Sequence, residues 1–280
     1  MNTKALLREF DLRPLKGLGQ NFLVDRGVLE RILTAAEVSP QDVVLEVGAG
    51  LGVLTRALAE RARRVVAVEV DPRLVKVLRE RLSEFSNTEV VPGDILALDI
   101  AQLIHAVDGE PTQPYKVVAN IPYYITSAVL RHILEQPSKP VLMVLMVQRE
   151  VAERIVAVPG HMSLLAVSVQ FYGQPSLVSR VSARCFHPIP NVDSAIVRID
   201  VHRQLPLPRD SIEAFFQVVR AGFGQRRKQL RNALAHGLQL PVERISEPLA
   251  RSGIDGRRRA ETLSVAEWVA LYHAVNVVEA

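Results

Sequence analysis

The chain has 280 residues, 48% of them apolar, which is enough for one large or two smaller domains with a hydrophobic core. Its longest apolar run, residues 141–147, is far too short to span a membrane, and the charged first ten residues do not resemble a signal peptide. The single cysteine, Cys185, excludes an internal disulfide and a cysteine-rich zinc site, so we expect a cytoplasmic protein.

The net charge of +4 is concentrated at one end of the chain. Residues 201–280 hold 12 Lys and Arg against 8 Asp and Glu, whereas residues 1–200 are balanced. Clustering of this kind favours an acidic partner such as a nucleic acid, although a modest excess also occurs on ordinary protein surfaces.

Residues 1–24 form a basic arm that ends in Gly19-Gln20-Asn21-Phe22-Leu23. Asp25 is placed to cap a helix, because apolar residues follow it at helical spacing. Strand and helix patterns then alternate. Strands are expected at residues 43–47, 65–70, 89–91, 116–119 and 141–147, and helices at 54–61, 72–82 and 128–134. This alternation predicts a Rossmann-like α/β fold with a mostly parallel sheet covered on both faces.

The pattern changes after residue 150. Strands are expected at residues 167–171, 177–182 and 195–201, without long helices between them, so the sheet should end with antiparallel members. A proline-containing linker at 205–208 precedes four predicted helices, at residues 211–221, 226–236, 242–252 and 265–275. The chain is therefore expected to divide into a sheet-containing domain, 1–204, and a small helical domain, 205–280.

Glycines recur in the turn after the first predicted strand, which reads Glu46-Val47-Gly48-Ala49-Gly50-Leu51-Gly52. Val53 occupies the position of the third glycine in a dinucleotide fingerprint, so the pyrophosphate-binding pattern is incomplete. An acid such as Glu46 is also unusual beside a diphosphate and better suited to a cationic ligand. S-adenosylmethionine, which has a sulfonium and an amine but no phosphate, is therefore favoured over NAD, the alternative.

Acidic residues follow the next two strands. Glu69 lies 21 residues after Gly48, where a carboxylate can accept hydrogen bonds from both ribose hydroxyls of a nucleotide-type ligand. Asp94 could accept a hydrogen bond from an adenine amino group, with Ile95 against the face of that ring. Asp94 could instead simply form a turn after Gly93.

A fourth segment, Asn120-Ile121-Pro122-Tyr123, follows the strand at 116–119. Ligands of open α/β sheets bind at this edge. The oxygen of Asn120 and nearby carbonyls can accept both hydrogens of a planar amino group, Pro122 restricts the backbone, and Tyr123 offers a flat face for a ring. The segment indicates a site for the amino group of a nucleobase, although an ordinary strand-to-helix turn is the alternative.

These segments together resemble the KsgA family of ribosomal RNA adenine dimethyltransferases over nearly the whole chain. The similar segments are residues 19–23, 46–52, 69, 93–94, 120–123, 186–194, 225–232 and 253–264. Ile121 and Tyr124 depart from the Leu and Asn that many family members have. Because only the carbonyl of Ile121 is asked to act, no loss of activity is expected.

The resemblance implies a cytoplasmic enzyme that uses S-adenosylmethionine. Methyl transfer needs no metal, and the seven histidines show no metal-ligand spacing. The sequence does not give the oligomeric state, and a monomer is the default expectation. The resemblance also implies dimethylation of N6 of two adjacent adenosines in a hairpin near the 3′ end of the small-subunit (16S) rRNA, during ribosome biogenesis. The residues expected around the cofactor are Asn21, Leu23, Gly48, Gly50, Glu69, Asp94, Ile95 and Asn120. The residues expected around the target adenine are Asn120, Ile121, Tyr123 and Phe186, although two prolines after Phe186 could also mark a simple rigid loop.

Basic residues point to contact with RNA. Arg226, Arg227, Lys228 and Arg231 are expected on the first two turns of a helix, and residues 257–259 form a second basic cluster. Such residues contact phosphates without reading sequence. A solvated basic helix is the alternative.

Three other functions share some of these features. A macrolide-resistance methyltransferase acting on 23S rRNA would share the loop and the catalytic segment. A DNA or protein-glutamine methyltransferase would also use an Asn-x-Pro-Tyr segment, although usually with Pro in place of Ile121. A ribosome-assembly factor that retains the fold without catalysis is the third possibility.

Overall fold

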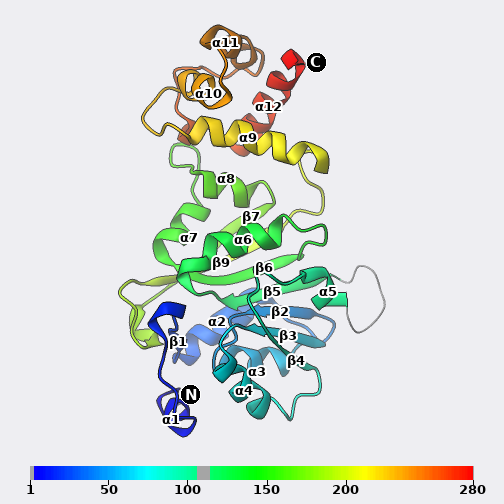
Figure 1. Cartoon of the computed structure of the whole chain (residues 1–280), viewed down its shortest axis with the longest axis vertical. Coiled ribbons are helices and arrows are strands. Elements are labelled where there is room, and N and C mark those ends of the chain that lie inside the picture. The colour runs from blue at the N-terminus through cyan, green and yellow to red at the C-terminus, as the bar shows by residue number, and fades with distance from the viewer. Residues whose placement is uncertain (1–2, 106–113, 280) are drawn as a thin grey trace. The chain divides into compact units, whose positions relative to one another are not determined.

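The computed structural model describes residues 3–105 and 114–279 (Figure 1). They divide into two compact units. The sheet unit comprises Met1–Glu153 and Gln174–Val201, and the helical unit comprises Arg154–Gly173 and His202–Ala280. The division expected from the sequence, at residues 204 and 205, stays a prediction, because compactness does not test which segments fold independently. No helix in the described ranges is long and apolar enough to cross a membrane.

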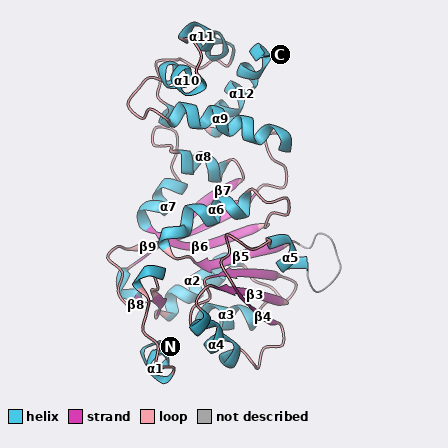
Figure 2. Cartoon of the chain, in the orientation of Figure 1, coloured by secondary structure: helices cyan, strands magenta, loops and turns pink. Residues whose placement is uncertain are grey.

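The helices and strands are distributed along the chain as follows (Figure 2). The helices are α1 (Thr3–Glu9), α2 (Arg26–Ala36), α3 (Val53–Ala59), α4 (Pro72–Arg81), α5 (Ile100–His105), α6 (Thr126–Leu134), α7 (Arg149–Ile155), α8 (Leu164–Gln170), α9 (Ile212–Phe223), α10 (Leu230–Leu238), α11 (Val242–Arg251) and α12 (Val265–Glu279). The strands are β1 (Phe22–Leu23), β2 (Val43–Val47), β3 (Arg64–Glu69), β4 (Thr88–Pro92), β5 (Tyr115–Asn120), β6 (Leu142–Gln148), β7 (Gly173–Val181), β8 (Phe186–His187) and β9 (Ser194–Val201).

Seven strands form one sheet in the order β4-β3-β2-β5-β6-β9-β7. The first five are parallel, and β9 runs antiparallel to β6. The expected parallel sheet with an antiparallel end is thereby confirmed. Chain order reverses direction between β2 and β5, which makes their carboxyl ends the topological switch point where open sheets bind ligands.

Register brings the two expected site loops together. Val43 pairs with Tyr115 and Leu45 with Val117, so the ends of β2 and β5 lie side by side. A Cβ added to Gly48 would lie 3.8 Å from the carbonyl oxygen of Asn120. The glycine turn and the Asn120 segment are therefore neighbours because their strands are adjacent.

Fully buried strands explain the apolar runs of the sequence. Every residue of β2 is buried, and β6 is buried up to its last residue. Val44, Val118 and Val144 share a hydrophobic cluster with the apolar faces of α2 and α3. A strand buried on both faces carries no polar alternation, as in other parallel sheets.

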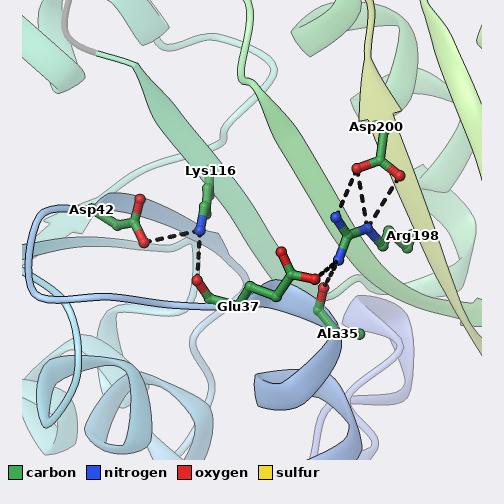
Figure 3. Close-up of polar contacts among 6 residues, drawn as sticks. All are labelled: Ala35, Glu37, Asp42, Lys116, Arg198 and Asp200. Atoms are coloured by element: carbon green, nitrogen blue, oxygen red, sulfur yellow. Dashed lines mark hydrogen bonds and ion pairs between the residues drawn. The ribbon is translucent and has the colours of Figure 1, made fainter.

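Helix α2 is fixed at both ends by side chains. The expected cap Asp25 accepts a hydrogen bond from the amide of Val28 at 2.8 Å. At the other end, Lys116 of β5 donates to the carbonyl of Glu37 at 2.7 Å, and Arg198 of β9 donates to that of Ala35 at 2.8 Å (Figure 3). Two cations, from the strands on either side of β6, thus bond the free carbonyls at the negative end of the helix dipole.

The helical unit has an aromatic core of its own. Phe171, Tyr172, Phe215 and Phe216 stack or meet edge to face, with centroids 4.8–6.2 Å apart. Trp268 is fully buried beside Gly222. These contacts explain how α9 and α12 pack, since each buried ring contributes a large apolar area.

Two local predictions were wrong. The strand expected at 167–171 is helix α8, because the side chain of Ser163 caps it by accepting a hydrogen bond from the amide of Ala166. A cap of this kind outweighs the strand preference of a short run rich in valine. The helix expected from 226 begins only at Leu230, so Arg227 and Arg231 are not neighbours four residues apart on one helix.

Candidate active site at the carboxyl edge of the sheet

One pocket of the sheet unit collects most of the expected site residues. Its lining includes Asn21, Leu23, Gly48, Gly50, Glu69, Asp94, Ile95, Asn120, Ile121 and Tyr123. They come from the arm and from the ends of β2, β3, β4 and β5. Phe186 is not among the residues that line the pocket in the described chain.

The glycine turn gives the pocket its floor. Gly48 has φ +75° and Gly50 has φ +60°, a left-handed conformation that side chains disfavour. A Cβ added to Gly48 would lie 3.3 Å from Pro122, and one added to Gly50 would lie 3.3 Å from the ring of Phe22. The backbone therefore approaches both the arm and the Asn120 segment too closely for larger residues.

Glu69 ties the glycine turn to the end of β3. One carboxylate oxygen accepts a hydrogen bond from the amide of Gly50 at 2.8 Å, and the other accepts from the amide of Asp71 at 2.9 Å. Burial raises the pKa of Glu69, against the opposing effect of these two bonds. Each oxygen retains a second lone pair, so the carboxylate can still accept from hydroxyls of a ligand.

Glu46 is the least satisfied group of the pocket. It is 2% exposed, and its Oε2 has no hydrogen-bond partner in the described structure. Burial raises its pKa to about 8, against the opposing effect of the hydroxyl of Thr55, and repulsion from Glu69 adds to the rise. Glu46, Glu69 and Asp94 all line the pocket, whereas no Lys, Arg or His does within the described residues. The pocket therefore favours a cationic ligand and disfavours a diphosphate.

Asp94 and Ile95 lie at the end of β4. Asp94 accepts a hydrogen bond from the amide of Leu96 at 3.0 Å, which is the geometry of a turn former. It also lines the pocket beside Ile95, which is 2% exposed. The turn and the ligand-binding interpretation are therefore compatible, because Asp94 shapes the loop through one oxygen and is also part of the pocket lining.

The arm closes one side of the pocket through side-chain amides. The side chain of Gln20 donates to Asp71 at 2.9 Å, and that of Asn21 donates to the carbonyl of Gly19 at 3.1 Å. Nδ2 of Asn120 donates to the carbonyl of Asn21 at 3.3 Å. This last bond orients the Asn120 amide, since its nitrogen is engaged and its oxygen remains an acceptor for a ligand.

The rest of the Asn120 segment is rigid. The amide of Ile121 donates to the carbonyl of Met146 at 3.2 Å, and the amide of Ile125 donates to that of Pro122 at 3.2 Å. The hydroxyl of Tyr123 is 2.6 Å from that of Ser194, which is fully buried, and burial raises the pKa of Tyr123. The ring of Tyr123 is thus held at its far end while it lines the pocket.

Phe186 lies next to the arm and away from the pocket surface. It is 2% exposed and pairs with Leu23 in the short sheet of β1 and β8. It shares a hydrophobic cluster with Leu23 and Val28. Phe186 therefore supports the arm residue Leu23, and its contact with a target base stays a prediction.

A second candidate region lies at the start of α10 in the helical unit. The amides of Leu230 and Arg231 donate to the carbonyls of Arg258 at 2.7 Å and Gly256 at 3.1 Å. The basic triplet (Arg226, Arg227 and Lys228) precedes the helix, is exposed, and forms no ion pair within the described ranges. It remains available for phosphates.

The second basic cluster is largely neutralised. Arg257 pairs with Asp255 at 2.9 Å, Arg258 pairs with Glu267, and Arg259 lies 3.8 Å from Glu261. The charge that the sequence shows at 257–259 is therefore less available to an RNA than that of the basic triplet.

A family model described as ribosomal RNA adenine dimethylase matches residues 14–276. The chain belongs to this family. A curated relative from Dehalococcoides mccartyi named ribosomal RNA small subunit methyltransferase A is 50% identical over 95% of this chain and 89% of its own length. A relative of the same name from Moorella thermoacetica is 44% identical over 96% of this chain and 95% of its own length.

Solved structures of two transferases share the fold of this chain. The 23S rRNA methyltransferase ErmE is 34% identical, with a TM-score of 0.72 over 91% of this chain and all of its own. A dimethyladenosine transferase from Plasmodium falciparum is 25% identical, with a TM-score of 0.79 over 92% of this chain and 98% of its own. The expected family membership and the α/β methyltransferase fold are thus confirmed.

Three residues that shape the pocket were not predicted from the sequence. Asp71 receives the hydrogen bond of Gln20, Ser194 anchors Tyr123, and Tyr124 lines the pocket itself. Ser194 ends a recognised motif, so a signal existed for it. For Asp71 the only signal was its position as an N-cap after Glu69.

Proposed function

We propose that this chain transfers methyl groups from S-adenosylmethionine to N6 of two adjacent adenosines in a 3′-terminal hairpin of small-subunit rRNA. The observation that carries the proposal is the meeting of the Asn120 acceptor with an acid-lined, glycine-floored pocket at one sheet edge. The choice of small-subunit rRNA is supported by relatives that bear this substrate class in their name at 39–50% identity.

The residues of the pocket fit this cofactor. Bound S-adenosylmethionine would supply an electrophilic methyl group on a positively charged sulfonium. Glu46, whose Oε2 is buried without a partner, suits a cationic ligand, and Glu69 can accept from ribose hydroxyls. Asp94 and Ile95 suit an adenine ring, and the lack of basic lining residues in the described chain argues against a dinucleotide.

The target amino group would be held by acceptors alone. The oxygen of Asn120 and the carbonyl of Ile121 accept its two hydrogens, which directs the nitrogen lone pair away from them. Tyr123 stacks against the base, a contact worth about 1–3 kcal/mol. No strong general base is required, because the amino group becomes acidic as it is alkylated. Catalysis is then mainly positioning, which can lower a two-substrate barrier by about 7–11 kcal/mol.

Labelled methyl transfer tests the proposal. Unmethylated small subunits, large subunits and naked rRNA are incubated with the enzyme, and products are identified by nucleoside mass spectrometry. Dimethyladenosine in the small-subunit sample alone is expected. Label in large-subunit RNA would instead favour an enzyme that acts on 23S rRNA, and bound but unlabelled RNA would favour an assembly factor without catalysis.

Within the same proposal, the basic triplet contacts rRNA phosphates. The logarithm of the RNA-binding constant falls linearly with the logarithm of the salt concentration, and each phosphate contact contributes about 0.7–0.9 to the steepness of that slope. Replacing all three residues with Gln should therefore make the slope shallower by about 2–3. A matched control removes three exposed arginines of the helical unit, Arg203, Arg209 and Arg251. Equal slopes for the two triple variants would remove the triplet from the RNA interface.

We place the enzyme in the cytoplasm, where ribosomes are assembled, and propose that it acts as a monomer with residues 205–280 as an RNA-binding domain. Light scattering of the enzyme alone and of its complex with the small subunit tests the monomer.

A further inference from the structure

The catalytic segment is followed by a second aromatic residue that the proposed mechanism does not use. Tyr124 lines the same pocket as Tyr123, yet its side chain is 61% exposed. Of the exposed large apolar and aromatic side chains in the described chain, only Val70 and Tyr124 line this pocket. Tyr124 therefore lies at the pocket mouth, where an incoming nucleic acid would pass.

The backbone that carries Tyr124 is fixed. It belongs to the 3₁₀ turn Tyr123–Ile125, which the amide of Ile125 closes by donating to the carbonyl of Pro122 at 3.2 Å. The hydroxyl of Thr126 donates to the carbonyl of Tyr123 at 3.2 Å. An exposed ring on a rigid turn loses little entropy when a flat ligand covers it.

One edge of the ring is supported by the arm. A Cβ added to Gly19 would lie 3.4 Å from Cδ1 of Tyr124 and 3.7 Å from Cε1. The hydroxyl of Tyr124, unlike that of Tyr123, has no hydrogen-bond partner in the described structure. What Tyr124 offers is therefore a ring surface and not an anchored polar group.

We propose that Tyr124 stacks on the base adjacent to the target adenosine, and so acts as a second stacking platform for a purine neighbour. This inference rests on the proposed function. A base that leaves its stack to enter the pocket also unstacks its neighbour, which costs a few kcal/mol. Tyr123 replaces the stacking contact that the target base loses, whereas Tyr124 replaces the stacking contact that the neighbouring base outside the pocket loses. The arrangement suits a substrate made of two adjacent adenosines.

The test compares Tyr124→Ala and Tyr124→Phe with the unchanged enzyme on unmethylated small subunits. Loss of base stacking should lower kcat/KM of Tyr124→Ala about 5- to 150-fold. Tyr124→Phe retains the ring and should stay within about twofold of the unchanged enzyme. A Phe variant as impaired as the Ala variant would overturn the inference, because the hydroxyl and not the ring would then matter.

A fluorescence readout separates stacking from a general defect. A hairpin RNA carries 2-aminopurine either at the target adenosine or at its neighbour, and quenching is measured at saturating enzyme. Tyr124→Ala should lose the quenching at the neighbour and retain it at the target. Unchanged quenching at the neighbour would overturn the inference.

The two proposals fail in different ways. If the unchanged enzyme does not methylate small subunits, the proposed function fails whatever the Tyr124 variants do. If it methylates them and Tyr124→Ala is equally active, only the stacking role fails. Because Tyr124 is 61% exposed at the pocket mouth, calorimetric affinity for S-adenosylmethionine should be retained in both variants. A loss of kcat/KM in Tyr124→Ala that weaker cofactor binding fully accounts for would overturn the stacking role.

Discussion

Replacing Glu46 with Gln should make the ligand-free protein more stable in a pH-dependent way. The buried carboxyl has a pKa of about 8, against an ordinary value of 4.5. Between these two values the folded protein holds a proton that the unfolded chain has lost. The free energy of unfolding therefore falls as pH rises, by about 1.4 kcal/mol per pH unit. From pH 6 to pH 8 the loss amounts to about 2 kcal/mol, because Glu46 is already half ionised at pH 8.

The Gln variant keeps the shape of the side chain without the titration. Its stability relative to the unchanged protein should therefore rise by about 2 kcal/mol between pH 6 and pH 8, measured by urea unfolding followed by circular dichroism. Glu80→Gln, which removes an exposed acid from α4, is the control and should show no comparable trend. A difference independent of pH, or a Gln variant that loses relative stability at pH 8, would refute the reasoning.

The same buried carboxyl links cofactor affinity to protons. A cationic ligand stabilises the ionised form of Glu46, so binding of S-adenosylmethionine near pH 7 should release up to one proton. Calorimetry in two buffers of different ionisation enthalpy measures this release. The Gln variant should bind more weakly and release fewer protons. Equal proton release by both proteins would show that Glu46 does not ionise on binding.

Three further substitutions test other parts of the site. Asn120→Ala should retain cofactor affinity and lose roughly 100-fold in turnover, because the target amino group is no longer positioned. Unchanged turnover in the methyl-transfer assay would contradict the role of Asn120 in positioning that group. Gly48→Ala should lower stability by about 1–2 kcal/mol and weaken cofactor binding in calorimetry, because its φ is +75° and its Cβ meets Pro122 at 3.3 Å. Lys116→Met should cost about 1–3 kcal/mol in urea unfolding at pH 7, since it removes hydrogen bonds to Asp42 and to the end of α2. Burial raises the pKa of Asp42, but hydrogen bonds from Lys116 and Ser39 outweigh burial and lower it below the ordinary value of 3.8. The ionised Asp42 therefore stabilises the fold above pH 3.8, and this stabilisation is lost as the pH falls through the folded pKa. The Lys116→Met difference should therefore narrow in acid, and a constant difference would contradict the pairing.

Much of the fold could be predicted because local and tertiary signals agree. The apolar runs of β2 and β6 have no polar alternation, which is characteristic of central parallel strands. Asp25 caps α2, and Pro72 begins α4, as their positions in the sequence indicated. Prediction failed where the signals conflict. In α8, valines favoured a strand while the Ser163 cap fixed a helix.

The candidate site was predictable in part for the same reason. Parallel strands deliver the residues that follow them to one edge, so the glycine turn, Glu69, Asp94 and Asn120 could be placed together from their order alone. No spacing rule predicts contacts between distant loops. The bond of Gln20 to Asp71 and that of Tyr123 to Ser194 arise only once the arm and β9 are packed. Burial of Phe186 against Leu23 is another such contact.

Several residues of the pocket suit a bound ligand better than they suit the empty protein. Glu46 is buried without a partner for one oxygen, and Gly48 and Gly50 hold left-handed backbone conformations. The carboxyl of Glu46 costs stability in the absence of ligand, and a cationic ligand in the pocket would relieve that cost. The two glycines adopt these conformations without strain, and they let the backbone approach a ligand closely. At the pocket mouth, the exposed ring of Tyr124 leaves apolar surface in contact with water in the free enzyme, and a stacked base would cover that surface. Substitutions that stabilise the free protein at Glu46 should therefore weaken ligand binding, which is the relation expected of a preorganised binding site.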